Sequence, residues 1–251
     1  MTVSAPLSIL DYRQPVEFQI GEVIIRSWNI LSRHFLTFVL LVGIAELLPL
    51  VLTLYLGKLS TTPRGGAIAA GAISIFQFMV TSFAQAIVVF AAFQDLRGRP
   101  VDGMESFRAG VKRLVPVIVS SILVVLLVGI GSILCLAPGL VALAAMAVVL
   151  PACVVERLGP IESMSRSADL TTGHRWPILA VAVAWAVIVY VVFFAIQAAM
   201  PGAAELPVQL ITWVWQLVAG SYMAVYTAIL YHDLRAIRDG IGIDEIASVF
   251  D

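Results

Sequence analysis

Glu46, a carboxylate near the middle of a long apolar stretch, is the residue of this chain most suited to chemistry inside a membrane. An ionised carboxylate at the centre of a bilayer costs at least about 2.5 kcal/mol, so Glu46 should be protonated, paired with a polar group or in contact with water. Each of these states suits a site for a proton or a small polar solute. The structural alternative is a protonated Glu46 that hydrogen-bonds a neighbouring helix.

Polar side chains also recur on one helical face in two other apolar stretches, at spacings of three and four residues. The first set is Gly71, Ser74, Gln77, Thr81 and Gln85; the second is Gln209, Thr212, Gln216, Gly220 and Thr227. The predicted intramembrane polar site comprises Glu46, Gln77, Thr81, Gln85, Gln209 and Gln216. The alternative is that these residues form hydrogen bonds between helices, with small residues that allow close packing.

A pattern of charged residues recurs along the chain and indicates an internal repeat. Four residues reappear at a constant offset of 140 positions: Glu22, Arg26, Ser27 and His34 correspond to Glu162, Arg166, Ser167 and His174. An aromatic-x-Asp-Leu-Arg motif occurs at 93–97 and again at 231–235. We predict a repeated unit of an interfacial helix, two membrane crossings and this exit motif. A degenerate middle copy would start near 102 and end at 155–157.

The repeated residues form a second candidate site, at the membrane surface. An Asp in the last turn of a helix opposes the helix dipole, so Asp95 and Asp233 should be offset by cations. The candidate cations at this depth are Arg26, Arg166, His34 and His174. The whole predicted cytoplasmic interface comprises Glu22, Arg26, His34, Asp95, Arg97, Glu162, Arg166, His174, Asp233 and Arg235. The alternative is that these residues are solvated anchors.

Long apolar segments must position both sites. The 251 residues are 61% hydrophobic and only 12% charged, which leaves too little polar surface for a soluble globule. A helical crossing needs about 20 apolar residues, and barrel strands would alternate instead of being continuously apolar. The predicted crossings are 36–56, 68–93, 114–136, 139–155, 176–200 and 206–230. We predict an all-α polytopic membrane helical bundle, with six transmembrane helices as three hairpin units and with cytoplasmic interfacial amphipathic helices.

The fourth crossing is the shortest of the six. It contains Pro151, so we expect a kinked or steeply tilted helix there. A tight Ala-Pro-Gly turn at 137–139 would join it to the third crossing. The helices before the first and fifth crossings have an apolar face and are predicted to lie on the membrane surface, with ordinary solvated helices as the alternative.

The basic residues predict the orientation. All Lys and Arg residues except Lys58 and Arg64 fall on one side of a six-crossing topology. Segments rich in Lys and Arg stay on the cytoplasmic side. We therefore predict a single integral membrane domain over 1–251 with both termini in the cytoplasm, namely a tail and interfacial helix at 1–35 and a second tail at 231–251.

Several strings resemble a known family. They are Val155-Glu156-Arg157-Leu158-Gly159-Pro160, then Ser165-Arg166-Ser167, Leu170-Thr171 and Gly173-His174-Arg175-Trp176, and finally Tyr231-x-Asp233-Leu234-Arg235 with Asp239-Gly240. The first strings are similar to the E-x-x-G-P … S-x-x-L-T-x-G-x-R-W stretch of the glycerophosphoryl diester phosphodiesterase membrane-domain family. The resemblance covers the whole chain and implies a six-pass protein of the bacterial inner membrane that handles or senses lipid. Some relatives also carry a soluble phosphodiesterase barrel, for which we expect no counterpart here and hence no hydrolase activity.

Absent motifs and the net charge argue against several classes of function. The chain lacks the motifs GxxxxGK[ST], G-x-S-x-G and HExxH, so we expect a protein that is not an enzyme and uses no cofactor or metal. Its net charge of −1 does not favour nucleic acid. The leading hypothesis is a non-catalytic module whose cytoplasmic interface binds membrane lipid, a partner membrane protein or a second copy of the chain. The alternative is a transporter or channel for a small polar solute or proton, using Glu46 and the polar stripes.

Overall fold

The structure is a computed structural model, and it describes residues 20–59, 63–201 and 205–239. Within these ranges it contains ten α-helices and no strand, so the predicted all-α class is confirmed. The helices are α1 (Ile20–Arg33), α2 (Phe35–Leu59), α3 (Pro63–Leu96), α4 (Gly103–Lys112), α5 (Leu114–Leu134), α6 (Leu136–Ala145), α7 (Val149–Val155), α8 (Pro160–Leu170), α9 (Arg175–Ala199) and α10 (Glu205–Asp239). Arg13 and the end of the predicted C-terminal tail, 240–251, lie outside the described residues.

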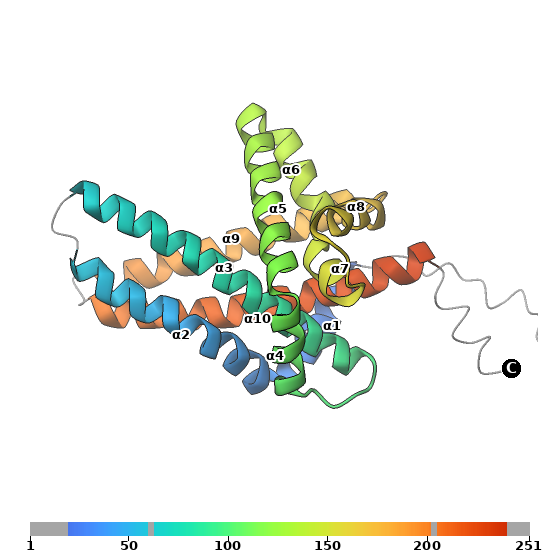
Figure 1. Cartoon of the computed structure of the whole chain (residues 1–251), viewed down its shortest axis with the longest axis horizontal. Coiled ribbons are helices and arrows are strands. Elements are labelled where there is room, and N and C mark those ends of the chain that lie inside the picture. Colours follow the sequence, from blue (N-terminus) through green and yellow to red (C-terminus); the bar gives the residue numbers. More distant parts are fainter. Residues whose placement is uncertain (1–19, 60–62, 202–204, 240–251) are drawn as a thin grey trace, which may run out of the picture.

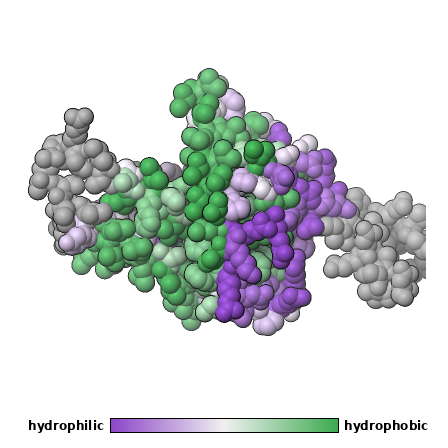
Figure 2. Space-filling model, in the orientation of Figure 1, coloured by the Kyte–Doolittle hydropathy of each residue, from purple (hydrophilic) through white to green (hydrophobic). Residues whose placement is uncertain are grey.

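The described chain contains six segments that are long and apolar enough to cross a membrane, which confirms the predicted number. They are Phe35–Tyr55, Ala70–Leu96, Leu114–Leu134, Leu136–Val155, Arg175–Ala199 and Leu206–Asp239. Large apolar side chains such as Leu36 and Ile133 are exposed on their outer faces, as expected where hydrocarbon is the solvent. Figure 2 shows this hydrophobic surface, with the hydrophilic residues gathered at one end of the molecule.

α10 continues as a helix to Asp239, so residues 231–239 of the predicted tail are helical. The predicted turn at 137–139 is wrong. The link between the third and fourth crossings is Cys135, whose extended backbone (φ −167°, ψ 146°) separates α5 from α6. Pro138 instead lies in the first turn of α6, where a missing N–H costs little. Gly139 lets the two backbones approach, because a Cβ there would lie 2.8 Å from the Ser132 Cα.

The fourth crossing is broken between α6 and α7, just before the proline that predicted a kink. Backbone groups freed inside a membrane need partners, because no water is available there. Ser167 of α8 supplies them: its hydroxyl donates to the Ala145 carbonyl at 2.8 Å and accepts from the Val148 N–H at 3.2 Å. α8 is thereby anchored against the break.

The core lies around α3 and α10, the two longest helices. Small residues of α3, such as Ala84 and Ala91, are fully buried and let α10 pack closely. Tyr226 and Tyr231 of α10 are among the largest buried side chains. In Figure 1, α2, α3, α9 and α10 extend to one side, while the α5–α6 hairpin projects at a steep angle to them.

The three short amphipathic helices gather at one end of the bundle. α1 packs on α10, α4 on α3, and α8 on α7. We call this region the polar end; it comprises α1, α4, α8 and the C-terminal turns of α3, α7 and α10, and it corresponds to the hydrophilic surface of Figure 2. The internal repeat behind this arrangement stays a prediction.

Replacing Ser167 by Ala should destabilise the bundle by about 1–3 kcal/mol, because the buried Val148 N–H loses its hydroxyl acceptor and the Ala145 carbonyl keeps only the longer hydrogen bond of 3.4 Å from Thr171. Thermal unfolding of the purified protein in mild detergent measures the loss. The control is Ser165→Ala on the exposed side of the same helix, with an expected change within about 0.5 kcal/mol. Equal stability of the two variants would contradict the role assigned to Ser167.

Candidate functional site

Glu46 is buried on α2 and is bonded to two side chains of α3. Gln77 Nε2 donates to Glu46 Oε2 at 2.7 Å, and Thr81 Oγ1 donates to Glu46 Oε1 at 2.6 Å. Because Gln77 and Thr81 are four residues apart, they lie on the same face of α3, the one that packs on α2. Both carboxyl oxygens therefore have a donor, which offsets part of the cost of burying this group.

A small cavity of about 50 Å³ adjoins Glu46 between α2, α3 and α10. Its lining contains the predicted Glu46, Gln77, Thr81, Gln85 and Gln216, together with Val42, Trp213, Leu217 and Gly220. Gln209 is not in this lining, because it lies two turns along α10 from Gln216. Trp213 adds a buried indole Nε1–H that has no hydrogen-bond partner in the described structure. This space suits one or two water molecules or a small ion, at about 30 Å³ per water.

Basic side chains of the polar end lie against carboxylates in the C-terminal parts of α3 and α10. Arg26 of α1 donates to both carboxylate oxygens of Asp233, at 3.0 and 2.9 Å. His34 Nε2 lies 2.9 Å from Asp95 Oδ1, with Arg33 at 3.6 Å from the same carboxylate. Two of the four candidates, Arg26 and His34, are therefore placed against the two aspartates. Only Asp95 lies in the last turn of its helix, where the dipole acts, because α10 continues for six residues beyond Asp233.

Arg166 does not pair with either of these aspartates. It binds Glu156 at the end of α7, with Nε at 3.1 Å from Oε1, and it also donates to Asp239 of α10. The Asp239 hydrogen bond, followed by the contact with Glu156, raises the pKa of Arg166 above its usual value. The Tyr231 hydroxyl donates to Glu156 as well. Glu156, which was absent from the predicted interface, is thus the carboxylate on which three helices converge.

The other predicted interface residues have separate roles. Glu162 caps α8, since the Gly159 N–H donates to Glu162 Oε2 at 3.0 Å. Glu22 is exposed on α1. His174 directly precedes α9, and its backbone N–H donates to the Thr171 carbonyl at 3.0 Å.

Arg97 and Arg235, the arginines of the two Asp-Leu-Arg motifs, line one cavity of about 500 Å³ at the polar end. The sequence predicts each arginine separately; the packing of α3 on α10 brings them together. Phe93 and Tyr231 line the same cavity, with ring centroids 5.6 Å apart in an edge-to-face arrangement. The remaining lining residues are Leu96, His232 and Ala236. A cavity with two guanidinium groups and a histidine suits an anion such as a phosphate.

α4 contributes residues that the sequence-based interface omitted. Met104, Phe107 and Val111 are large apolar side chains exposed on this helix, and Arg108 and Lys112 are exposed beside them. The missed signal is the spacing of three and four between the apolar positions, next to basic ones.

Buried Gln94 of α3 fixes α4 in place: its Oε1 accepts from the Asp102 N–H at 2.9 Å, and its Nε2 donates to Glu105 at 2.9 Å.

Within 20–59, 63–201 and 205–239, no group of three or more His, Cys, Asp or Glu side chains is arranged to hold a metal ion. No protein-family model matches the chain, and no curated protein or solved structure matches it either. The resemblance to the glycerophosphoryl diester phosphodiesterase membrane domain therefore stays an expectation from sequence.

Replacing Glu156 by Gln should destabilise the polar end by about 1–3 kcal/mol, because a charge-assisted acceptor for Arg166 and Tyr231 is lost. Chemical unfolding in detergent, followed by circular dichroism, measures the difference. Glu22→Gln is the matched control, since Glu22 is exposed, and it should change stability by less than about 0.5 kcal/mol. A Glu156→Gln variant as stable as the control would show that the convergence on Glu156 is not stabilising.

Proposed function

We propose that this chain is a non-catalytic multi-pass membrane protein that binds the phosphate-bearing headgroup of an anionic membrane lipid at its polar end. The observation that carries the proposal is the cavity of about 500 Å³ shared by Arg97 and Arg235. Arg97 directly follows α3 and Arg235 lies in α10, so the two helices present one arginine each to the same cavity. The proposed membrane is the bacterial inner membrane, with the polar end and both termini in the cytoplasm, in accord with the distribution of Lys and Arg.

Arg97 is the cation most available to a ligand in this cavity. It is exposed, and no described carboxylate lies within ion-pair distance of it. Arg235, in contrast, is 3.4 Å from Asp239 and 3.7 Å from Glu156. A phosphate bound here would receive its strongest hydrogen bonds from Arg97, while Arg235 would add charge from a fixed position.

α4 supports the proposal, because its exposed apolar and basic residues suit the boundary between headgroups and acyl chains. Phe107 would enter the apolar layer, while Arg108 and Lys112 would reach anionic headgroups. Each basic residue near an anionic membrane surface contributes about 1 kcal/mol. Arg26 and Arg166, in contrast, are engaged by carboxylates, so we assign them to the stability of the polar end.

A second function is favoured by one observation, the cavity beside Glu46. A carboxyl group held by Gln77 and Thr81 next to space for water is an arrangement suited to taking up a proton or a small cation inside a membrane. The second candidate is therefore a transporter or channel for a proton or a small polar solute.

Replacing Arg97 by Gln should weaken binding of dihexanoyl phosphatidylglycerol to the detergent-purified protein about 10- to 150-fold, because a charge-assisted hydrogen bond of about 1.5–3 kcal/mol is lost. Calorimetric titration measures the affinity. Arg99→Gln is the control: Arg99 is also exposed but does not line the cavity. Equal affinities of the two variants would refute the headgroup site, and stronger binding of inorganic phosphate than of lipid would identify a soluble anion instead.

For the second candidate, Glu46→Gln should abolish proton flux into vesicles that contain the protein and a pH-sensitive dye, because the amide cannot release a proton. Gln209→Ala is the control and should leave flux unchanged, since Gln209 does not line the Glu46 cavity. Equal flux in Glu46→Gln and in the unmodified protein would exclude proton transport through this residue.

A further inference from the structure

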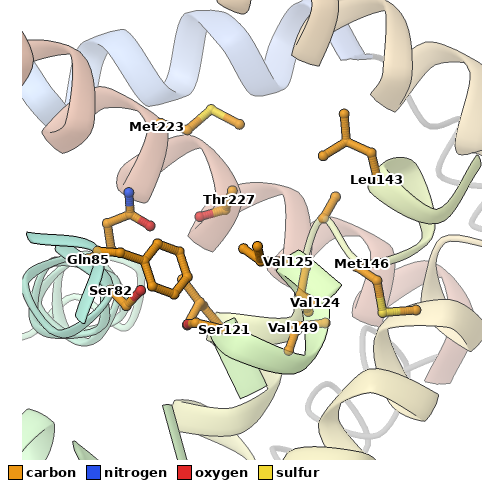
Figure 3. A pocket seen from close by; sticks show the side chains of 13 residues that line it. Ser82, Gln85, Ser121, Val124, Val125, Leu143, Met146, Val149, Met223 and Thr227 are labelled. Carbon is orange, nitrogen blue, oxygen red and sulfur yellow. The ribbon is translucent and has the colours of Figure 1, made fainter. Parts of the chain in front are cut away.

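A third cavity, of about 250 Å³, lies in the membrane-spanning part of the molecule, where the α5–α6 hairpin diverges from α3 and α10. Its wall is mainly apolar and includes Val124, Val149 and Met223. Figure 3 shows these side chains around one space, together with four polar residues from three helices: Ser82, Gln85, Ser121 and Thr227. It shares no lining residue with the cavity of Arg97 and Arg235.

Ser121 of α5 marks this cavity as a site that can receive a ligand. The residue is only 8% exposed, and its hydroxyl oxygen is buried with no hydrogen-bond partner in the described structure. A buried hydroxyl without a partner costs about 1–3 kcal/mol. Ser82, which is 5% exposed, lines the cavity across from it on α3. A ligand that places a carbonyl oxygen beside Ser121 would recover this cost.

The cavity opens toward the bilayer. Val125 and Leu143 line it and are also 52% and 39% exposed on the outer faces of α5 and α6. Ser121 is eight residues from Arg113, which corresponds to about 12 Å along the helix from the polar end. Since the headgroup region on each side of the hydrocarbon core is about 5–8 Å thick, this depth lies just below the ester groups, at the first part of the acyl chains.

We propose that this cavity binds one acyl chain of a bilayer lipid, with the Ser121 hydroxyl donating to the ester carbonyl of that chain. The size fits, because an apolar cavity of about 150 Å³ already holds a benzene molecule. The apolar wall would enclose the first part of the chain, and the rest would leave past Val125 and Leu143. The site does not depend on headgroup charge, so it is separate from the function proposed above.

The test uses the full chain in vesicles of phosphatidylcholine that contain a trace of phosphatidylcholine with a diazirine next to one ester group. After illumination, mass spectrometry of peptides identifies the labelled residues. We expect label on Ser82, Ser121 and Val149, which are at most 8% exposed and are therefore out of reach of lipid at the protein surface. Label confined to exposed residues such as Leu126 would overturn the proposal.

Two variants on α5 test the occupancy of the space. Ser121→Phe fills the cavity and should lose the label on Ser82 and Val149, whereas the control Ile122→Phe, on the exposed side, should keep it. Arg97→Gln should also keep it, because the headgroup site is separate. Persistent label in a folded Ser121→Phe protein would overturn the proposal. If Ser121→Phe fails to fold, the position of the label in the unmodified protein still tests whether the cavity holds a lipid chain.

The hydrogen bond is tested by competition between ester-linked and ether-linked phosphatidylcholine. The ester lipid should displace the probe better from the unmodified protein, and Ser121→Ala should remove this preference while keeping the labelling. Equal competition in the unmodified protein would overturn the role of Ser121.

A fatty acid that carries a diazirine is the last comparison. Labelling by the free acid with none by phosphatidylcholine would overturn the assignment to a bilayer lipid.

Discussion

Helices that end in a carboxylate set the constraint on which the rest of this structure depends. Asp95, Glu156 and Asp239 lie at the C-terminal ends of α3, α7 and α10, where the helix dipole is already negative. Arg33 of α1 lies 3.6 Å from Asp95, and Arg166 of α8 binds Glu156 and Asp239, while Arg26 of α1 binds Asp233 farther back on α10. Neutralisation therefore holds the short helices across the end of the bundle.

The same constraint shapes the cavities. α3 and α10 are tied together at the polar end, so the arginines that follow their aspartates share one anion-sized space. Farther into the membrane, α5 and α6 diverge from α3 and α10 and leave a mostly apolar space with few polar groups. Charge is thus concentrated where water or headgroups are available, while the deeper cavity contains only neutral polar side chains. Gln85 lines both this cavity and the one beside Glu46, so the two spaces adjoin on α3.

The sequence predicts the crossings well because continuous apolarity over about 20 residues has few other physical explanations. Spacing also places Gln77 and Thr81 on one face, and the structure bonds both to Glu46. Helical spacing predicts a face, but it does not predict how far along a neighbouring helix two residues meet. For this reason Gln209 lies outside the cavity that Gln216 lines. Arg166 pairs with Glu156 because α8 packs on α7, and the local sequence pattern does not predict this packing. The residues of α4 are missing from the predicted interface because the match of this helix to the repeat is weak.

The hydroxyl of Ser167 has a consequence for how the chain folds. It completes the backbone hydrogen bonds of a crossing that ends before it, across 22 positions from Ala145 and 19 from Val148. The fourth crossing therefore reaches its full set of backbone hydrogen bonds only once α8 has packed against it, so the crossing and the helix that follows it fold as one unit.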